Sequence, residues 1–236
     1  MKIGTLYLIP NVIAEATHQS VIPSQVIEVL KSLRFFLAED VRTARRYFSS
    51  LKIFDSIERL HFTILDKETV LSDLPLMMKP LFEGYDVGIV SESGCPGVAD
   101  PGAIAVRFAH QHMIKVVPLV GPSSILLALM SSGLNGQQFA FHGYLPIEAK
   151  EASVKIKELE KESSLKNQTQ IFIETPFRNN SLLTNLIKSL KPSTILCIAM
   201  DLTSPQEQIV SKSVREWAKE PIQLAKANTV FLFLGN

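Results

Sequence analysis

The stretch Ser91–Gly102, SESGCPGVADPG, places three glycines and two prolines between two apolar segments. The segment before it, Asp86–Val90, resembles a short buried strand, and the segment after it, Ala103–Ala109, has helical character. Strand, loop and helix in this order predict a crossover with its loop at the carboxyl end of a strand. In open α/β sheets, ligands bind at that edge. The alternative is that the glycines and prolines only form tight turns.

The composition is that of an ordinary globular protein. Of the 236 residues, 46% are hydrophobic and 20% are charged, and the formal net charge is +1. Such a balance argues against a protein that wraps nucleic acid by bulk charge, although a local basic patch is compatible with it. The two cysteines, Cys95 and Cys197, show no metal-binding spacing, which is typical of a reducing compartment. Without a signal-peptide pattern or a long apolar segment, we expect a cytoplasmic protein with no membrane span and no metal.

Short apolar segments alternate with amphipathic ones in the first half of the chain. Strands are expected at 4–10, 35–40, 86–91 and 115–120, and helices at 23–33 and 41–51. This βαβα order predicts an α/β fold with a mostly parallel sheet and helices on both of its faces.

The pattern changes near residue 120. Strands are expected at 139–146, 169–174, 193–200, 207–213 and 228–235, with helices near 149–162 and 177–190. Because the last two strands are separated by only a short segment, a mixed sheet is expected here. We therefore predict two α/β domains, 1–120 and 121–236.

A second loop rich in glycine and proline, Gly121-Pro122, also joins a strand to a helix. Two such loops predict one shared pocket. Gly97–Gly102 lacks the Lys-Ser/Thr of a phosphate loop, and no dinucleotide fingerprint follows the first strand. The prolines remove N–H donors, so the loop is a poor phosphate cradle. A ligand with an adenosine and a cationic centre suits its carbonyl groups and the nearby carboxylates better.

The stretch Ser91–Gly102 resembles the Ser-Asp-Ala-Gly-x-Pro-x-x-x-Asp-Pro-Gly signature of the tetrapyrrole methylase superfamily. It is most similar to the branch that methylates a ribose 2′-hydroxyl of small-subunit ribosomal RNA. Seven further segments agree with the family in order along the chain. They are GTLYLIP (4–10), AEDVR (38–42), VVPLVGPSS (116–124), SGL (132–134), FHGYLP with FIETPFR (141–146 and 172–178) and MDLTS (200–204).

The resemblance implies S-adenosylmethionine as the methyl donor, a donor site in the cleft between the two domains, a homodimer and an RNA acceptor. It also implies a set of donor-binding residues. These are Ser91, Gly94, Cys95, Pro96, Gly97, Val98, Ala99, Asp100, Ser123, Ser124, Gly143 and Leu145.

Several positions depart from this branch. The first strand is followed by Pro10-Asn11-Val12-Ile13-Ala14, which has no glycine where the branch has one. Asp66-Lys67-Glu68 replaces His-Asn-Glu, Ser204 replaces a lysine, and Ala227-Asn228 replaces Gly-Glu. The longer relatives also carry a C-terminal extension beyond the position of Asn236. The motifs assigned to the donor therefore match the branch better than the other motifs do. The identity of the methyl acceptor stays open.

Each candidate also has a purely structural reading. Asp100 before Pro101 is a typical helix N-cap, and the serines Ser123 and Ser124 could also cap a helix. Arg42, Arg45 and Arg46 share one helix face, which is either a phosphate-contacting patch or a solvated surface. Glu174 and Arg178 have the spacing of an ion pair. His142 lies in a predicted strand between apolar neighbours, which is typical of a packed core or pocket histidine.

Transfer of a methyl group to a hydroxyl gains from alignment and from a positioned general base. The candidate bases are Glu92, Glu39 and Asp40, which are expected at strand ends. Three functions stay open. The first is RNA ribose 2′-O-methylation, the second is methylation of a small molecule such as a tetrapyrrole, and the third is donor binding without catalysis.

Overall fold

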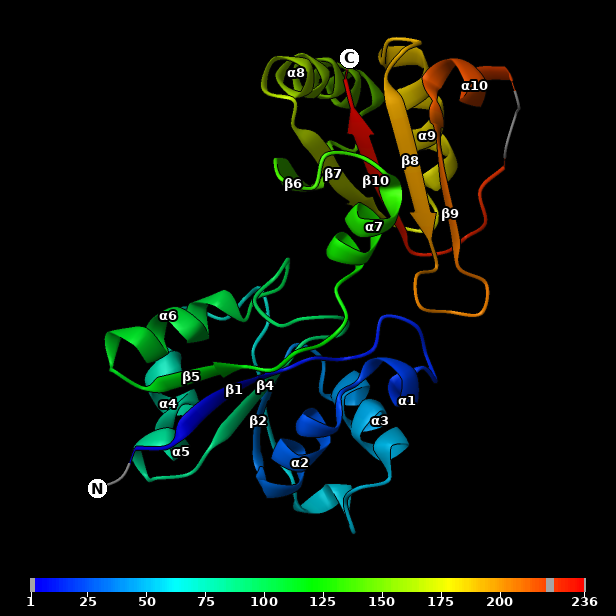
Figure 1. The fold of residues 1–236 in the computed structure, drawn as a ribbon. Helices are drawn as coiled ribbons and strands as arrows, with labels where there is room; N and C mark the ends of the chain where they lie inside the picture. Colours follow the sequence, from blue (N-terminus) through cyan, green and yellow to red (C-terminus); the bar gives the residue numbers. More distant parts are fainter. Residues whose placement is uncertain (1–2, 220–222, 236) are drawn as a thin grey trace. The chain divides into compact units, whose positions relative to one another are not determined.

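The computed structural model describes residues 3–219 and 223–235 (Figure 1). The chain divides into two compact units, Met1–Ser123 and Ser124–Asn236. Each unit contains one five-stranded sheet covered by helices. The α/β class is therefore confirmed. Within the described ranges, no helix has the length and apolar character that a bilayer crossing requires.

The sheet of the first unit is parallel throughout, with the strand order β3-β2-β4-β1-β5. Its strands are β1 Thr5–Ile9, β2 Phe35–Ala38, β3 His61–Ile64, β4 Val87–Val90 and β5 Lys115–Pro118. Its helices are α1 His18–Val21, α2 Ser24–Ser32, α3 Val41–Leu51, α4 Leu74–Met77, α5 Lys79–Phe82 and α6 Ala103–Gln111, with a short 3₁₀ turn at Ile57–Arg59.

Helices cover both faces of this sheet, as the βαβα pattern predicts (Figure 1). On one face, Ile9, Phe36 and Val90 pack with residues of α2 and α3. On the other face, Leu6 and Ile89 pack with residues of α4, α5 and α6. Alternate residues of a strand point to opposite faces, so a sheet that is buried on both sides needs apolar residues at nearly every strand position.

Strand β3 is an element that the sequence did not predict. It lies at the edge of the sheet and pairs only with β2, through His61 to Ile64. Three of its four side chains are exposed, so the strand carries neither an apolar run nor a strict alternation. An edge strand of this length is stabilised by its backbone ladder, which leaves little signal in the side chains.

The second unit contains a mixed sheet with the order β6-β7-β10-β8-β9, as predicted. Strands β6 and β7 are parallel, and the other neighbouring pairs are antiparallel. The strands are β6 Phe139–Tyr144, β7 Thr169–Glu174, β8 Ile195–Met200, β9 Gln208–Ser213 and β10 Thr229–Leu234. The helices are α7 Ser124–Ser132, α8 Ala149–Lys166, α9 Asn179–Ser189 and α10 Val214–Lys219.

Two cores flank this sheet. The larger core packs Phe172, Phe231 and Phe233 against α8, α9 and α10, and it includes the buried Trp217. The smaller core packs Ile171, Val230 and Leu232 against α7. Helix α7 ends at Ser132, and the next residue, Gly133, has a φ of 72°, the left-handed conformation expected of a glycine after a helix C-terminus.

Candidate active site

The loop Ser91–Gly102 leaves the carboxyl end of β4, which lies between β1 and β2 in the sheet. The loop that follows β1 is its neighbour on one side. Asn11 in that loop is 2% exposed, and its backbone N–H donates to the Gly94 carbonyl oxygen at 2.8 Å. The Asn11 side-chain amide donates to the carbonyl oxygens of Ser91 and Glu92, at 3.1 and 3.0 Å. Asn11 therefore holds the start of the candidate donor loop in place.

The site prediction did not include Asn11. The only signal was its position, because a polar residue directly after a buried strand must satisfy its amide somewhere. In the sequence, the same residue appeared only as a departure from the family pattern.

The loop after β5 contacts both the candidate donor loop and the loop after β1. Cys95 Sγ lies 3.3 Å from the Pro122 carbonyl oxygen, in hydrogen-bonding geometry. A Cβ atom on Gly121 would lie 2.1 Å from Cβ of Pro10, so only glycine allows the loops after β1 and β5 to approach this closely. Three loops, after β1, β4 and β5, thus form one connected structure within the first unit. Burial, followed by the charge of Asp100, raises the pKa of the Cys95 thiol.

Asp100 organises the second half of the loop. Its Oδ1 accepts hydrogen bonds from the N–H groups of Gly97 and Gly102, at 2.6 and 2.7 Å. Helix α6 begins only at Ala103, and its N-cap position is Gly102, so Asp100 is not the N-cap that its place before Pro101 suggested. The backbone between the two bonded glycines is tight, with left-handed φ angles of 83° at Gly97 and 59° at Ala99.

The other carboxylate oxygen of Asp100, Oδ2, does not accept hydrogen bonds from the loop backbone. Oδ2 is buried and has no hydrogen-bond partner among the residues that the structure describes. Burial raises the pKa of Asp100. The N–H groups of Gly97 and Gly102 oppose that shift, as does the nearby hydroxyl of Ser91, which itself donates to the Ser93 carbonyl oxygen. A buried carboxylate oxygen without a partner is costly unless a ligand, water or cation approaches it.

Asp100 lines a cavity of about 460 Å³, whose other lining residues are Glu39, Asp66, Lys67, Thr69, Ala99, Pro101 and Ile104. Glu39 follows β2, and Asp66 lies after β3, so the cavity lies at the carboxyl ends of adjacent strands. The pKa of Glu39 is raised, first by burial and then by the negative charges of Glu92 and Asp100. The structure therefore brings Glu92 and Asp100 close enough to Glu39 to act on its pKa, although Glu39 and Asp100 are 61 positions apart in the sequence.

Asp40 has a different environment from Glu39. Its Oδ1 accepts a hydrogen bond from the Thr43 N–H at 2.6 Å and caps α3. This hydrogen bond lowers the pKa of Asp40. A carboxylate with a low pKa and an occupied oxygen is a weaker proton acceptor than Glu39. The sequence could not separate these two neighbours, because both directly follow the strand.

Helix α3 presents Arg42, Arg45 and Arg46 to the surface. Arg45 lies 5.5 Å from the centroid of the Phe62 ring, and Arg46 forms an exposed ion pair with Glu15 at 3.5 Å. These contacts favour the reading of a solvated helix face over that of a phosphate-binding patch.

The remaining predicted donor residues lie in the second unit or at its border. Ser124 is the first residue of α7, and Gly143, with a φ of 66°, lies where the pairing of β6 with β7 shifts register. Leu145 is 3% exposed and belongs to the larger core, so only its backbone is available to a ligand.

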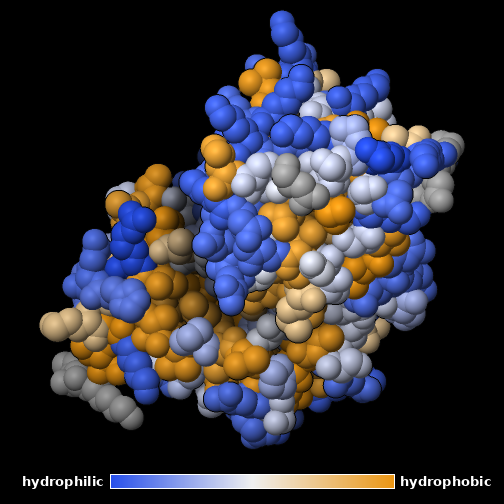
Figure 2. All heavy atoms as spheres, turned by 45° about the horizontal axis from the view of Figure 1, so that its top comes forward, coloured by the Kyte–Doolittle hydropathy of each residue, from blue (hydrophilic) through white to orange (hydrophobic). Residues whose placement is uncertain are grey.

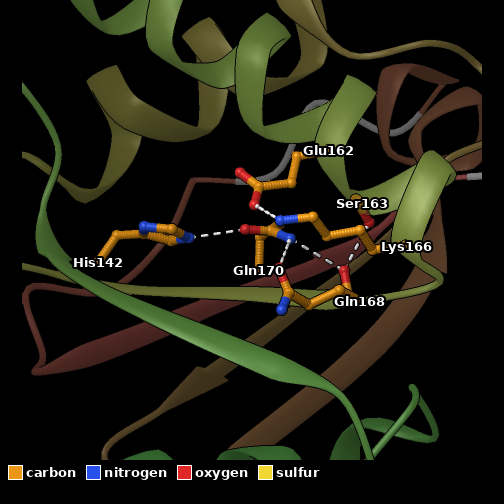
Figure 3. Close-up of polar contacts among 6 residues, drawn as sticks. All are labelled: His142, Glu162, Ser163, Lys166, Gln168 and Gln170. Atoms are coloured by element: carbon orange, nitrogen blue, oxygen red, sulfur yellow. Dashed lines mark hydrogen bonds and ion pairs between the residues drawn. The ribbon is translucent and has the colours of Figure 1, made fainter.

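His142 belongs to a polar network inside the second unit (Figure 3). Its Nε2 lies 2.6 Å from Oε1 of Gln170, a fully buried residue of β7. The Gln170 side-chain amide donates to the carbonyl oxygen of Gln168, which also accepts from Ser163 Oγ. The contacts support the reading of His142 as a packed histidine. In the described part of the chain, no group of three His, Cys, Asp or Glu side chains is arranged to hold a metal ion.

Glu174 and Arg178 form the ion pair that their spacing suggested, with 3.0 Å between the guanidinium and the carboxylate. The Glu174 side chain is fully buried, and Arg178 also donates to the Pro146 carbonyl oxygen at 3.3 Å. The pair joins the end of β7 to the loop after β6.

The chemistry of the first-unit site fits the cationic donor that the sequence predicts. Three carboxylates, those of Glu39, Asp66 and Asp100, line one cavity. Lys67 also lines it, but its ammonium lies 3.9 Å from the Glu68 carboxylate, so negative charge prevails at the cavity. Carboxylates of this kind favour a positively charged group over a phosphate. The loop residues Gly94, Cys95, Gly97 and Asp100 would hold such a ligand, and Glu39 and Glu92 would face its charge.

Comparisons with known proteins agree with this chemistry. Residues 25–218 match the family model of the Tetrapyrrole (Corrin/Porphyrin) Methylases. The chain is 30% identical over 236 residues to the Ribosomal RNA small subunit methyltransferase I of Escherichia coli, covering 99% of this chain and 78% of that protein. The protein of the same name from Vibrio cholerae is 29% identical over 239 residues, covering 98% of this chain and 77% of its own length.

Solved structures show the same fold at lower identity. The methyltransferase CobJ has a TM-score of 0.61 at 17% identity, covering 99% of this chain and 94% of its own. The Uroporphyrin III C-methyl transferase from Thermus thermophilus has a TM-score of 0.60 at 15% identity, covering 99% and 98%. The chain belongs to the tetrapyrrole methylase family and is an S-adenosylmethionine-dependent methyltransferase.

Proposed function

We propose that the chain methylates a ribose 2′-hydroxyl of small-subunit ribosomal RNA. The observation that carries this proposal is the 30% identity, across 99% of the chain, to a protein named Ribosomal RNA small subunit methyltransferase I. The resemblance of the loop Ser91–Gly102 to the ribose-methylating branch supports the choice of acceptor atom.

The donor, when bound, supplies an electrophilic methyl group on a positively charged sulfur. In this proposal the loop Ser91–Gly102 holds the donor. Asn11 and Cys95 connect this loop to the loops after β1 and β5, so the protein itself sets its shape. Preorganisation of this kind aligns the reacting atoms, which can account for much of the rate. Asp100 shapes the loop through its two backbone hydrogen bonds, and its negative charge favours a cationic ligand in the cavity that it lines.

Glu39 is the general base of this proposal. Among the three candidate carboxylates, it lines the cavity and has a raised pKa. It would take the proton of the acceptor hydroxyl while the hydroxyl oxygen bonds to the methyl carbon and the methyl–sulfur bond breaks, so that the demethylated donor leaves as a neutral thioether. Burial, and then the negative charges of Glu92 and Asp100, raise the pKa of Glu39, which makes it a stronger proton acceptor than an isolated glutamate. Asp40 instead caps α3.

The test is methyl transfer from labelled S-adenosylmethionine to small ribosomal subunits, followed by nuclease mapping of the modified nucleotide. Resistance of the adjacent phosphodiester to alkali is expected, because a methylated 2′-oxygen cannot attack it. A methyl group on a base would contradict the proposed acceptor atom. Transfer only to an added tetrapyrrole would select the small-molecule alternative, and donor binding without any transfer would select the non-catalytic one.

We also propose that the protein acts as a homodimer in the cytoplasm, as the family resemblance implies. Sedimentation equilibrium of the full chain tests the dimer, and a single species of monomer mass at micromolar concentration would contradict it. Fractionation of cells that produce the protein tests its location.

A further inference from the structure

Phe177 lies in the short loop between β7 and α9, and its side chain is 83% exposed. Nζ of Lys226 lies 5.5 Å from the centroid of the Phe177 ring. Lys226 itself precedes β10, whose first residue Thr229 pairs with Glu174 at the end of β7. Two segments that are 49 residues apart in the sequence thus bring an exposed ring and an ammonium group together. We refer to these two side chains as the Phe177–Lys226 pair.

An exposed apolar side chain alone does not mark a site, since hydrophobic residues reach the surface in several places (Figure 2). The backbone that carries the pair is the distinguishing feature. The Arg178 N–H donates to the Thr175 carbonyl oxygen at 2.9 Å, and the Thr175 N–H donates to the buried Glu174 carboxylate at 2.7 Å. The ion pair of Arg178 with Glu174 closes the same turn. The ring therefore stands on a rigid turn.

The segment of Lys226 is attached to the same turn. Asn179 donates to the carbonyl oxygens of Ala225 and Ala227, at 3.4 and 2.8 Å, and to the hydroxyl of Thr229. Asn180 forms a reciprocal pair of hydrogen bonds with the backbone of Leu224. These bonds fix the positions of the two segments that carry the exposed pair. Neither exposed side chain belongs to a core cluster of the unit, so packing does not account for the arrangement.

We infer that the Phe177–Lys226 pair binds an unstacked base of single-stranded RNA, with the ring on the base and the ammonium on the adjoining phosphate. An aromatic face beside a cation is the combination by which proteins hold single strands. The inference rests on the proposed function, because it assigns a contact of the RNA acceptor. It also agrees with a net charge near zero, since stacking adds affinity without bulk positive charge.

A flat tetrapyrrole could also stack on a phenylalanine, but the surroundings favour RNA. Small ligands bind in concave sites that enclose them. The cavity of about 530 Å³ in this unit is lined by Pro146, Val154 and the charged side chains of Lys150, Glu151, Lys155 and Glu158, and it includes neither member of the pair. The open position of the ring suits one base of a longer chain.

The first experiment uses Phe177→Trp as a reporter of stacking. The single natural tryptophan, Trp217, is 3% exposed and gives a constant background. We expect a short single-stranded RNA of mixed sequence to quench the new fluorescence, and the same RNA in a duplex to quench it far less. Quenching by an anionic tetrapyrrole but not by RNA would overturn the assignment.

The second experiment separates stacking from charge. Phe177→Leu keeps an apolar side chain but removes the ring, and we expect it to weaken single-strand binding by about 5- to 150-fold with an unchanged salt dependence. Lys226→Gln is expected to make the logarithmic salt slope shallower by about 0.7. Tyr85→Ala is the control, because Tyr85 is also an exposed aromatic residue but lies two positions before β4, in the other unit.

The outcomes distinguish this inference from the proposed function. If the unchanged protein methylates small ribosomal subunits but Phe177→Leu binds RNA as tightly as Tyr85→Ala, the inference fails and the proposed function stands. If the unchanged protein neither binds nor methylates RNA, both fail.

Discussion

The side-chain amide of Asn11 donates to the carbonyl oxygen of Ser91 at 3.1 Å, across 80 positions of sequence. The same amide reaches Glu92 at 3.0 Å, so one buried residue holds the first turn of the candidate donor loop. The loop is thereby shaped by the protein before a ligand binds.

Asn11→Ala would leave the carbonyl oxygens of Ser91 and Glu92 without this donor. We expect a loss of about 1–3 kcal/mol in the free energy of unfolding, since buried acceptors lose their partner. We also expect weaker binding of S-adenosylmethionine, because the loop is no longer held. Urea denaturation and calorimetric titration measure the two effects. Asn185→Ala is the control. Asn185 donates one exposed hydrogen bond to the Ala149 carbonyl oxygen and accepts one from Ser189 Oγ, and it lies in the other unit, far from the loop in sequence. Equal effects of the two substitutions would contradict the special role of Asn11.

Glu39→Gln tests the proposed base. We expect the rate of methyl transfer at saturating donor to fall by about 10²- to 10⁴-fold, which is the usual contribution of a general base. Asp40→Asn is the neighbouring control. Asparagine caps a helix about as well as aspartate, so we expect this variant to keep both its stability and its rate of methyl transfer. A Glu39→Gln variant with the unchanged rate rules Glu39 out.

The pH dependence of the rate gives an independent measure of Glu39. Because burial and the nearby carboxylates raise the pKa of Glu39, its protonated, inactive form persists to a higher pH than that of an ordinary glutamate. Activity is therefore expected to rise with pH through this raised pKa, and Glu39→Gln should remove that rise. A pH profile of kcat/KM reports the pKa of the essential base in the free enzyme. An identical acid limb in both proteins would assign the titration to another group.

Gly121→Ala tests the close approach of the loops after β1 and β5. The new methyl group would lie 2.1 Å from Pro10 Cβ, so the two loops must move apart. Overpacking of this kind costs about 1–3 kcal/mol of unfolding free energy. Gly136→Ala is the control, because no atom lies within 4 Å of the position that its new methyl group would take. Thermal denaturation compares them, and similar melting temperatures would show that the loops adapt freely.

The two thiols should be slow to alkylate in the native protein. Burial and Asp100 raise the pKa of Cys95, and burial raises the pKa of Cys197 to about 11. A raised pKa means that little reactive thiolate is present at neutral pH. Mass spectrometry after treatment with iodoacetamide should find neither cysteine modified until denaturant is added. Rapid native modification of Cys95 would indicate a loop more open than the structure describes.

Much of the secondary structure could be predicted from local pattern. The helix at Val41–Leu51 and the strand at Thr169–Glu174 have the predicted bounds, because each combines a clear periodicity with defined ends. Strand β3 was missed because its exposed side chains carry no such pattern. The role of Asp100 was ambiguous for a different reason: a loop-closing carboxylate and a helix N-cap place the same residue before the same proline.

The sequence by itself determined the family, since seven short motifs in order are far more specific than any one of them, and with the family it determined the fold and the methyl donor. Only the tertiary structure decided which side chains act together. Glu39 and Asp40 are adjacent in sequence, yet one faces a cavity with other carboxylates while the other caps a helix. Asn11 can bond to the donor loop only because β1 and β4, from distant parts of the chain, lie side by side in the sheet. Sequence spacing reports local geometry, whereas the charges and donors around a group depend on long-range pairing of strands.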